Sequence, residues 1–287
     1  MAPAPVIPAS IKSAVDEAAR SLASATTETP RLDAEVLMAF LLGWSRAQLF
    51  AHWDEPPTEE QLATYRQLVA RRADGEPVAY IRQLKEFLGL DFYVDSRVLI
   101  PRPETELLVA RAIQQVHGRP APLVVDVGTG SGAIAVGILK SCPGVRLIAT
   151  DLSENALAVA RLNAQRHEVQ PEFLAGFLLD PVAGPIDVLV ANLPYLSREE
   201  YESLLDTSIV YEPRLALTDG ADGLRLFDEL LAQVPDKLAA DGCVLLEIGC
   251  GQPAALAELA TVRLPGFRPT VFPDYAGLPR MLQIARA

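Results

Sequence analysis

The chain has 287 residues, of which 50% are hydrophobic and 22% charged, and its formal net charge is -12. This length predicts one large domain with a smaller companion. The negative charge argues against a protein that binds nucleic acid by neutralising phosphates, and no apolar run approaches the roughly 20 residues of a membrane span. Three cysteines without a Cys-x-x-Cys pair and only three histidines disfavour a disulfide framework or a zinc site. We therefore predict a cytoplasmic protein without a metal.

The N-terminal part of the chain is predicted to be helical. Residues 1–9 are rich in Ala and Pro, lack the features of a secretory signal, and are interpreted as a flexible tail. Apolar residues at helical spacing over 10–23 and 36–41 predict two amphipathic helices. A third helix is expected to begin at Thr58, because Thr58 and Gln61 have the spacing of a capping box. Residues 10–82 are thus expected to form a small helical domain.

A change of pattern follows, from helical spacing to short apolar segments with turn residues. The stretch from Glu86 to Ile100 predicts a β-hairpin inside a linker that covers 83–101. Pro101 and Pro103 end it, and a helix is expected from there to His117. The remainder, 102–287, is expected to be the catalytic domain.

After Pro122, strands and helices alternate, which predicts an α/β domain with a mostly parallel sheet and helices on both faces. Helices are expected to begin at Ser131 and Ser153, and another is expected over 223–238. The seven expected strands cover 123–127, 146–150, a short segment near Phe173, 186–191, 243–248, 267–272 and 281–285.

A glycine-rich turn stands between the first of these strands and the next helix. It contains Gly128, Thr129, Gly130, Ser131 and Gly132. Glycines in this context let the backbone approach a nucleotide-like ligand closely. The second strand ends at Asp151, and a carboxylate at that position can accept both ribose hydroxyls of an adenosine. The alternative is structural: the glycines make a tight turn and Asp151 caps the following helix.

Two features favour S-adenosylmethionine over a dinucleotide as the ligand. The spacing of Gly128, Gly130 and Gly132 differs from the G-x-G-x-x-G of dinucleotide folds, which hold a pyrophosphate. Asp126 stands just before the turn, where a carboxylate would attract an ammonium group and repel a phosphate. A buried strand-end Asp with a purely structural role is the alternative for Asp126.

The strand over 186–191 ends in Asn192, Leu193, Pro194 and Tyr195. In a doubly wound sheet, ligands bind at the carboxyl ends of the strands, so this segment is expected to face the cofactor. An amide nitrogen is a poor nucleophile and must be positioned. The Asn192 side-chain oxygen and the carbonyl of Leu193 can together accept both N–H bonds of a primary amide, while Pro194 restrains the loop and Tyr195 packs on the amide plane. A strand-ending turn with a core aromatic is the alternative.

Several further motifs, read with these, resemble the HemK-type release-factor glutamine N5-methyltransferases over about residues 32–286. The resemblance rests on the following stretches: Gly75 to Ile81, Glu86-Phe87, Val98 to Glu106, Tyr211 to Leu217, Gly220 to Leu224, Glu247 to Gly249 with Gln252, and Asp274 with Arg280. It implies a Rossmann-like class I methyltransferase fold that uses S-adenosylmethionine and releases S-adenosylhomocysteine. The implied reaction methylates the glutamine of the Gly-Gly-Gln motif in peptide-chain release factors, and so acts in translation termination.

By the same resemblance, Gly128 to Gly132 would hold the methionine part of the cofactor, Asp151 its ribose, and Phe177 would lie beside the adenine. A core aromatic is the alternative for Phe177. Asn192 to Tyr195 would bind the glutamine, and the helical domain would help to hold the protein substrate. The family usually has Asn-Pro-Pro-Tyr, whereas here Leu193 replaces the first proline; Gly176 stands where a polar residue is usual, and Gln83 where glycine is common.

Three alternatives to this function stay open at the level of sequence. A ribosomal-protein glutamine methyltransferase shares the catalytic loop, and an adenine-N6 methyltransferase could hold an exocyclic amine in the same way, although the basic surface that it needs is missing. A cofactor-binding module without turnover is the third. With no apolar stripe evident in the sequence, a monomer is expected.

Overall fold

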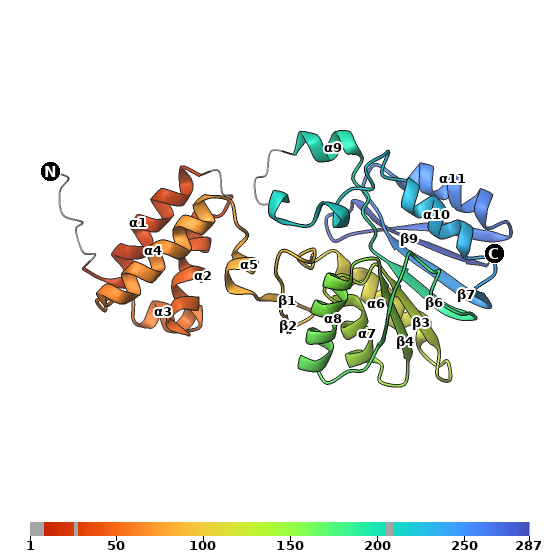
Figure 1. Ribbon diagram of the computed structural model, residues 1–287, viewed down its shortest axis with the longest axis horizontal. Coiled ribbons are helices and arrows are strands. Elements are labelled where there is room, and N and C mark those ends of the chain that lie inside the picture. Colours follow the sequence, from red (N-terminus) through yellow and green to blue (C-terminus); the bar gives the residue numbers. More distant parts are fainter. Residues whose placement is uncertain (1–8, 26–27, 205–208, 287) are drawn as a thin grey trace. The chain divides into compact units, whose positions relative to one another are not determined.

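The computed structural model describes residues 9–25, 28–204 and 209–286, and it divides into two compact units (Figure 1). The first unit runs to Gln83 and includes the short 3-10 turn η1 (Ile209–Tyr211); the second runs from Leu84 and contains the sheet. The expected tail, 1–9, lies outside the described residues except for Ala9. No helix in the described ranges is long and apolar enough to cross a membrane.

The first unit is a helical bundle. Its helices are α1 (Ile11–Ala23), α2 (Pro30–Leu42), α3 (Arg46–Ala51), α4 (Glu59–Ala73) and α5 (Val78–Arg82). Thr58 begins α4 with the predicted capping box, in which its hydroxyl accepts a hydrogen bond from the Gln61 N–H. Ser10 begins α1 in the same way. The two short helices α3 and α5 were not predicted, because five or six residues give too little periodicity to detect.

The second unit opens with a hairpin, β1 (Lys85–Phe87) and β2 (Leu90–Phe92), followed by α6 (Thr105–Val116). The hairpin is shorter than the predicted stretch 86–100, since no strand follows Phe92 before α6. Leu88 and Gly89 form its two-residue turn and both have positive φ, as a type I′ turn requires. A glycine meets this requirement without strain, whereas Leu88 is held there because its side chain packs into the core beneath α7.

The predicted sheet is present, with seven strands in the order β5-β4-β3-β6-β7-β9-β8. Strand β9 runs antiparallel to the other six strands of this sheet. The strands are β3 (Leu123–Val127), β4 (Arg146–Asp151), β5 (Glu172–Ala175), β6 (Ile186–Ala191), β7 (Leu238–Glu247), β8 (Phe267–Pro273) and β9 (Pro279–Arg286). The chain order reverses between β3 and β6, and this switch point is where ligands bind in open α/β sheets.

Helices cover both faces of the sheet (Figure 1). On one face lie α6, α7 (Ala133–Ser141) and α8 (Glu154–Arg166), and on the other α10 (Arg225–Gln233) and α11 (Pro253–Arg263). Neighbouring residues of β3 show the division, since Val124 packs with the first group and Val125 with the second, and both are fully buried. Burial on both faces explains why these strands are continuous apolar runs.

Two predictions about helix boundaries were wrong. The helix expected over 223–238 ends at Gln233, because Pro235 cannot continue it, and Leu238 belongs to β7. The helix expected from Ser131 begins at Ala133, because Gly132 has φ +80° and cannot be helical. Two helices of the second unit were not predicted, α9 (Arg198–Ser203) and α11, and the 3-10 turn η2 (Arg214–Ala216) is also additional.

Candidate active site

The glycine-rich turn lies at the carboxyl end of β3, beside β4. The amide groups of Gly128 and Thr129 both donate to the carbonyl of Thr150, each at 2.9 Å, which binds the turn to the next strand. Gly128, Gly130 and Gly132 all have positive φ. A Cβ atom on Gly132 would lie 3.1 Å from the Cβ of Ala160, so the third glycine permits the close approach of α8. The turn is therefore a closely packed backbone cradle, with Gly128 exposed and Gly130 half-buried.

Asp126 lies behind this turn and is completely buried. One carboxyl oxygen accepts a hydrogen bond of 2.6 Å from the Thr129 hydroxyl, while its Oδ1 atom has no partner among the described residues. Burial, and then the charge of Asp151, raises the pKa of Asp126 to about 7. A buried acceptor without a partner fits the ammonium group of an amino-acid ligand and would repel a phosphate. The residues present thus fit S-adenosylmethionine.

Asp151, at the end of β4, organises the neighbouring loops. Its carboxylate accepts from the Gly130 N–H at 2.9 Å and from the Ser153 N–H at 2.8 Å. Ser153, not Asp151, is the N-cap of α8, while the Asp151 carboxylate holds the backbone of the two neighbouring loops. The Asp151 carbonyl accepts from the Gly176 N–H at 3.0 Å, which brings half-buried Phe177 to the same edge of the sheet. The side chain of Phe177 packs against the core that contains α10 and α11.

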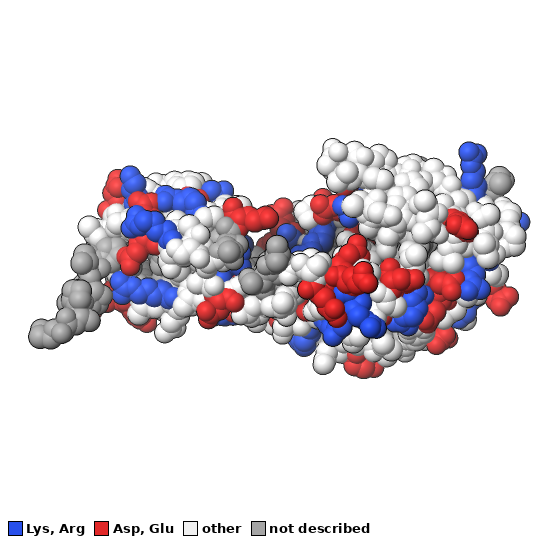
Figure 2. Space-filling model, turned by 90° about the horizontal axis from the view of Figure 1, so that it is seen from above, with Lys and Arg blue, Asp and Glu red and all other residues white. Residues whose placement is uncertain are grey.

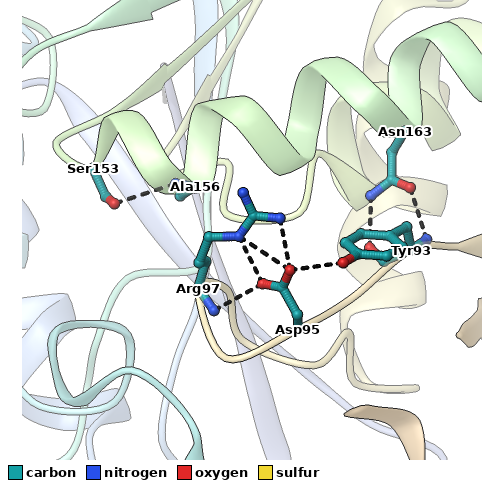
Figure 3. A network of polar contacts seen from close by, with 6 residues as sticks. All are labelled: Tyr93, Asp95, Arg97, Ser153, Ala156 and Asn163. Carbon is teal, nitrogen blue, oxygen red and sulfur yellow. Dashed lines mark hydrogen bonds and ion pairs between the residues drawn. The ribbon is translucent and has the colours of Figure 1, made fainter. Parts of the chain in front are cut away.

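A buried asparagine that was not singled out from the sequence joins the turn to the segment after β2 (Figure 3). Asn163, on α8, accepts from the Tyr93 N–H at 2.7 Å and donates to the carbonyls of Tyr93 and Ser131, both at 2.9 Å. Tyr93 also donates to Asp95, which pairs with Arg97. The only signal in the sequence is a polar residue on the apolar face of α8.

The segment Asn192 to Tyr195 follows β6, directly beside the glycine turn. Val127 and Ala191 are paired across β3 and β6, so Gly128 and Asn192 are the first residues beyond two adjacent strands. Asn192 is half-buried, and its Nδ2 atom lies 3.2 Å from the Thr105 hydroxyl. The structure thus brings the amide of Asn192 and the predicted cofactor turn to one end of the sheet.

Gln252 holds the backbone of Tyr195 in place. Its Nε2 atom donates to the carbonyl of Tyr195 at 2.9 Å and to that of Gly223 at 3.1 Å, while its Oε1 accepts from the Gly249 N–H. A Cβ atom on Gly223 would lie 2.3 Å from the Tyr195 carbonyl oxygen, so this position requires glycine. Burial raises the pKa of the Tyr195 phenol, which therefore stays protonated and is unsuited to act as a base.

Two of the motifs quoted for the family resemblance contact one another. Glu212 is buried, and its carboxylate accepts hydrogen bonds from the Ile100 N–H and from the guanidinium of Arg102. The contact joins residues more than a hundred positions apart and fixes the stretch that leads into α6. The stretch from Val98 to Glu106 is thus fixed within the second unit by an ion pair between buried Glu212 and partly exposed Arg102.

The fold and the site together define an S-adenosylmethionine-dependent methyltransferase. The features that define it are the switch point of the sheet, the glycine cradle, the strand-end acid and the Asn-Leu-Pro-Tyr loop. The chain is 44% identical, over 241 residues, to the release factor glutamine methyltransferase of Bordetella pertussis, a match that covers 83% of this chain and 88% of the relative. It belongs to the release factor glutamine methyltransferase family.

Other comparisons agree with this assignment. The release factor glutamine methyltransferase of Rhodopirellula baltica is 39% identical over 273 residues, with 91% of each chain covered. Residues 13–82 match the PrmC N-terminal domain and residues 104–224 the methyltransferase small domain. A methyltransferase from Pyrococcus furiosus shares the fold, with a TM-score of 0.52 at 20% identity, over 78% of this chain and 98% of that one.

Proposed function

We propose that this chain transfers the methyl group of S-adenosylmethionine to the side-chain amide nitrogen (N5) of the glutamine in the Gly-Gly-Gln motif of peptide-chain release factors. Its relatives named release factor glutamine methyltransferase support the substrate. The observation that carries the reaction is the placement of Asn192 next to Gly128 at the switch point of the sheet. An amide acceptor beside a cofactor cradle is the arrangement that amide methylation needs.

The cofactor site is proposed to use both ends of the glycine turn. The charge of Asp126, buried behind the turn, attracts the ammonium group, and the amides of Gly128 to Gly132 line the methionine part. Asp151 accepts the ribose hydroxyls with the lone pairs that Gly130 and Ser153 leave free. Phe177 covers the adenine. When bound, S-adenosylmethionine supplies an electrophilic methyl group on a sulfonium.

The chain's own contribution to the chemistry is positional. The side-chain oxygen of Asn192 and the backbone carbonyl of Leu193 accept the two N–H bonds of the glutamine amide, which aims its nitrogen at the methyl group. Bound there, S-adenosylmethionine would supply the methyl group for the new N–CH₃ bond and leave as S-adenosylhomocysteine, while one N–H proton of the amide would pass to solvent. Leu193 supplies its carbonyl whatever its side chain, so the replacement of proline leaves this acceptor intact. Pro194 restrains the loop and Tyr195 packs on the amide plane.

The surface charge supports a protein substrate over nucleic acid. On the face drawn in Figure 2, Lys and Arg side chains are interspersed with Asp and Glu and form no continuous basic stripe, and the net charge is -12. Affinity for DNA or RNA depends on clustered basic groups that neutralise phosphates. We propose that the helical unit, residues 10–82, helps to hold the release factor, with 83–101 as the linker and 102–287 as the catalytic part, in a cytoplasmic monomer that uses no metal.

The function is tested by incubating the full chain with methyl-labelled S-adenosylmethionine and purified release factor, followed by peptide mass spectrometry. We expect the label on the glutamine of Gly-Gly-Gln. A release factor with that glutamine replaced by asparagine is the matched control and should stay unlabelled. Label on a ribosomal protein offered in the same mixture, with none on the release factor, would refute the proposed substrate while keeping the chemistry.

A further inference from the structure

Behind Asn192 lies a short chain of hydrogen bonds that involves two buried residues from distant parts of the sequence. Thr105 is the first residue of α6, and its hydroxyl donates to the Oε2 atom of Glu247 at 2.7 Å. The Nδ2 atom of Asn192 donates to the same hydroxyl at 3.2 Å. Thr105 and Glu247 are 4% and 2% exposed, so water does not compete for these contacts.

The direction of these bonds is set by what each group can donate. Above about pH 7 the Glu247 carboxylate is ionised and only accepts, so the single hydroxyl proton of Thr105 is then committed to Glu247. The hydroxyl oxygen can then only accept, and of the two ends of the Asn192 amide only the NH₂ end can donate to it. The amide is therefore held with its NH₂ group toward Thr105 and its Oδ1 turned away from it.

We infer that Thr105 and Glu247 are positioning residues that orient the Asn192 amide so that its oxygen, and not its nitrogen, faces the substrate glutamine. The inference rests on the proposed acceptor role of Asn192. With the opposite orientation, an NH₂ group would face the NH₂ group of the substrate, and two donors repel. Neither Thr105 nor Glu247 has to touch the substrate for this effect.

The surroundings of Glu247 keep this chain of bonds responsive to pH. Burial, together with the charge of Glu104, raises the pKa of Glu247 to about 7. The hydrogen bonds from Thr105 and Asn192 and the charge of Arg280 lower this pKa. The charged or titratable groups that face it are Glu104, Arg280 and Tyr195. Once protonated, Glu247 can donate to Thr105, which frees the Thr105 proton and lets the Asn192 amide reverse.

The first test compares Thr105→Val with Thr105→Ser. Valine keeps the volume of threonine without the hydroxyl, and we expect kcat for release factor methylation to fall about tenfold or more, with the Kd for S-adenosylhomocysteine changed less than threefold. Serine keeps the hydroxyl and should restore at least half of the activity. Thr261→Val makes the same change on α11, where the hydroxyl bonds within its own helix, and should leave kcat unchanged. Equal kcat for wild type and Thr105→Val would overturn the inference.

A double-mutant cycle separates positioning from a general structural effect. In an Asn192→Ala background there is no amide to orient, so Thr105→Val should lower kcat no further, whereas a structural defect would lower it by the same factor in both backgrounds. That second result would overturn the inference. Thermal melting of each variant shows that it is folded before its kcat is compared.

The pH profile gives an independent readout. The kcat of the wild type should decline below about pH 7, because Glu247 takes up a proton. The glutamine of Glu247→Gln does not titrate. This variant should have a lower kcat than the wild type at pH 8 and no decline in kcat below pH 7. A Glu247→Gln enzyme with the wild-type rate and profile would contradict the inference. If the wild type itself does not methylate release factor, the proposed function is wrong, and the orientation of Asn192 is not what has been refuted. The two failures are therefore distinguishable.

Discussion

The side chain of Leu193 lies directly against Gly128, because a Cβ atom on that glycine would be 3.3 Å from the Cδ2 of Leu193. Leu193 is 4% exposed and belongs to the core between the sheet, α10 and α11. The residue that replaces the family's first proline thus joins the substrate loop to the cofactor turn by packing. Its carbonyl is a proposed acceptor in the substrate loop, while its side chain packs against the cofactor turn.

Leu193→Ala should therefore weaken both stability and cofactor binding. Removing a buried leucine side chain costs about 2–5 kcal/mol of unfolding free energy, because a cavity is left behind. Chemical denaturation measures this loss, and calorimetry with S-adenosylhomocysteine should show weaker binding. Leu215→Ala, at a position that is 76% exposed, is the matched control and should change neither quantity. Unchanged cofactor affinity in a destabilised Leu193→Ala would mean that the packing does not support the turn.

Asn192→Ala should remove the proposed substrate acceptor and leave the cofactor site largely intact. We expect kcat/KM for release factor to fall about a hundredfold or more, as for the loss of one transition-state hydrogen bond, while the Kd for S-adenosylhomocysteine changes by less than about threefold. Steady-state kinetics and calorimetry on the same preparation give both values. Parallel losses of activity and cofactor affinity would assign Asn192 to the cofactor instead.

Asn163→Leu should destabilise the catalytic unit. Leucine has a similar size, but it removes three hydrogen bonds and leaves the carbonyl of Ser131 without this donor in a buried setting. We expect the unfolding free energy to fall by about 3–5 kcal/mol, since each unsatisfied buried group costs about 1–3 kcal/mol. Asn155→Leu makes the same change at an exposed position of α8 and should be nearly neutral. Similar melting temperatures for the two variants would show that the buried contacts contribute little.

Asp126 predicts a pH dependence of cofactor binding. Its pKa is raised to about 7 by burial and by Asp151, and an ammonium ligand favours the ionised form. Binding of S-adenosylhomocysteine should thus be tighter at pH 7.5 than at pH 5.5, and it should release protons, which calorimetry in two buffers counts. Asp126→Asn should bind more weakly at both values and lose most of this dependence. If Asp126→Asn released as many protons on binding as the wild type, the released protons would come from another group.

The same raised pKa fixes the sign of the effect on stability without ligand. Between the ordinary value of 3.8 and about 7, the folded chain keeps a proton on Asp126 that the unfolded chain loses. The contribution of Asp126 to the unfolding free energy therefore falls as the pH rises through this window. Denaturation midpoints measured at pH 5 and pH 8 for wild type and Asp126→Asn isolate that contribution. A decline with pH that is equally steep in both proteins would rule it out.

Local patterns in the sequence were sufficient for much of the architecture. The apolar run from Leu123 to Val127 predicted β3 with both bounds correct, and the capping box at Thr58 located the start of α4. Both signals lie within a few neighbouring residues, so they do not depend on the rest of the fold. Helix α11 was not predicted, because its apolar periodicity is weak. Helix α10 was predicted to extend past Pro235, although a proline there ends it.

The sequence by itself determined the kind of fold, the glycine turn and the loop from Asn192 to Tyr195, because spacing along the chain carries each of these. Only the tertiary structure decided which groups meet there. Thr105 lies 87 positions from Asn192 and 142 from Glu247, and Asn163 lies 70 from Tyr93. Contacts at such separations depend on strand order and on the packing of α6 and α8 against their neighbours, and no local pattern encodes them.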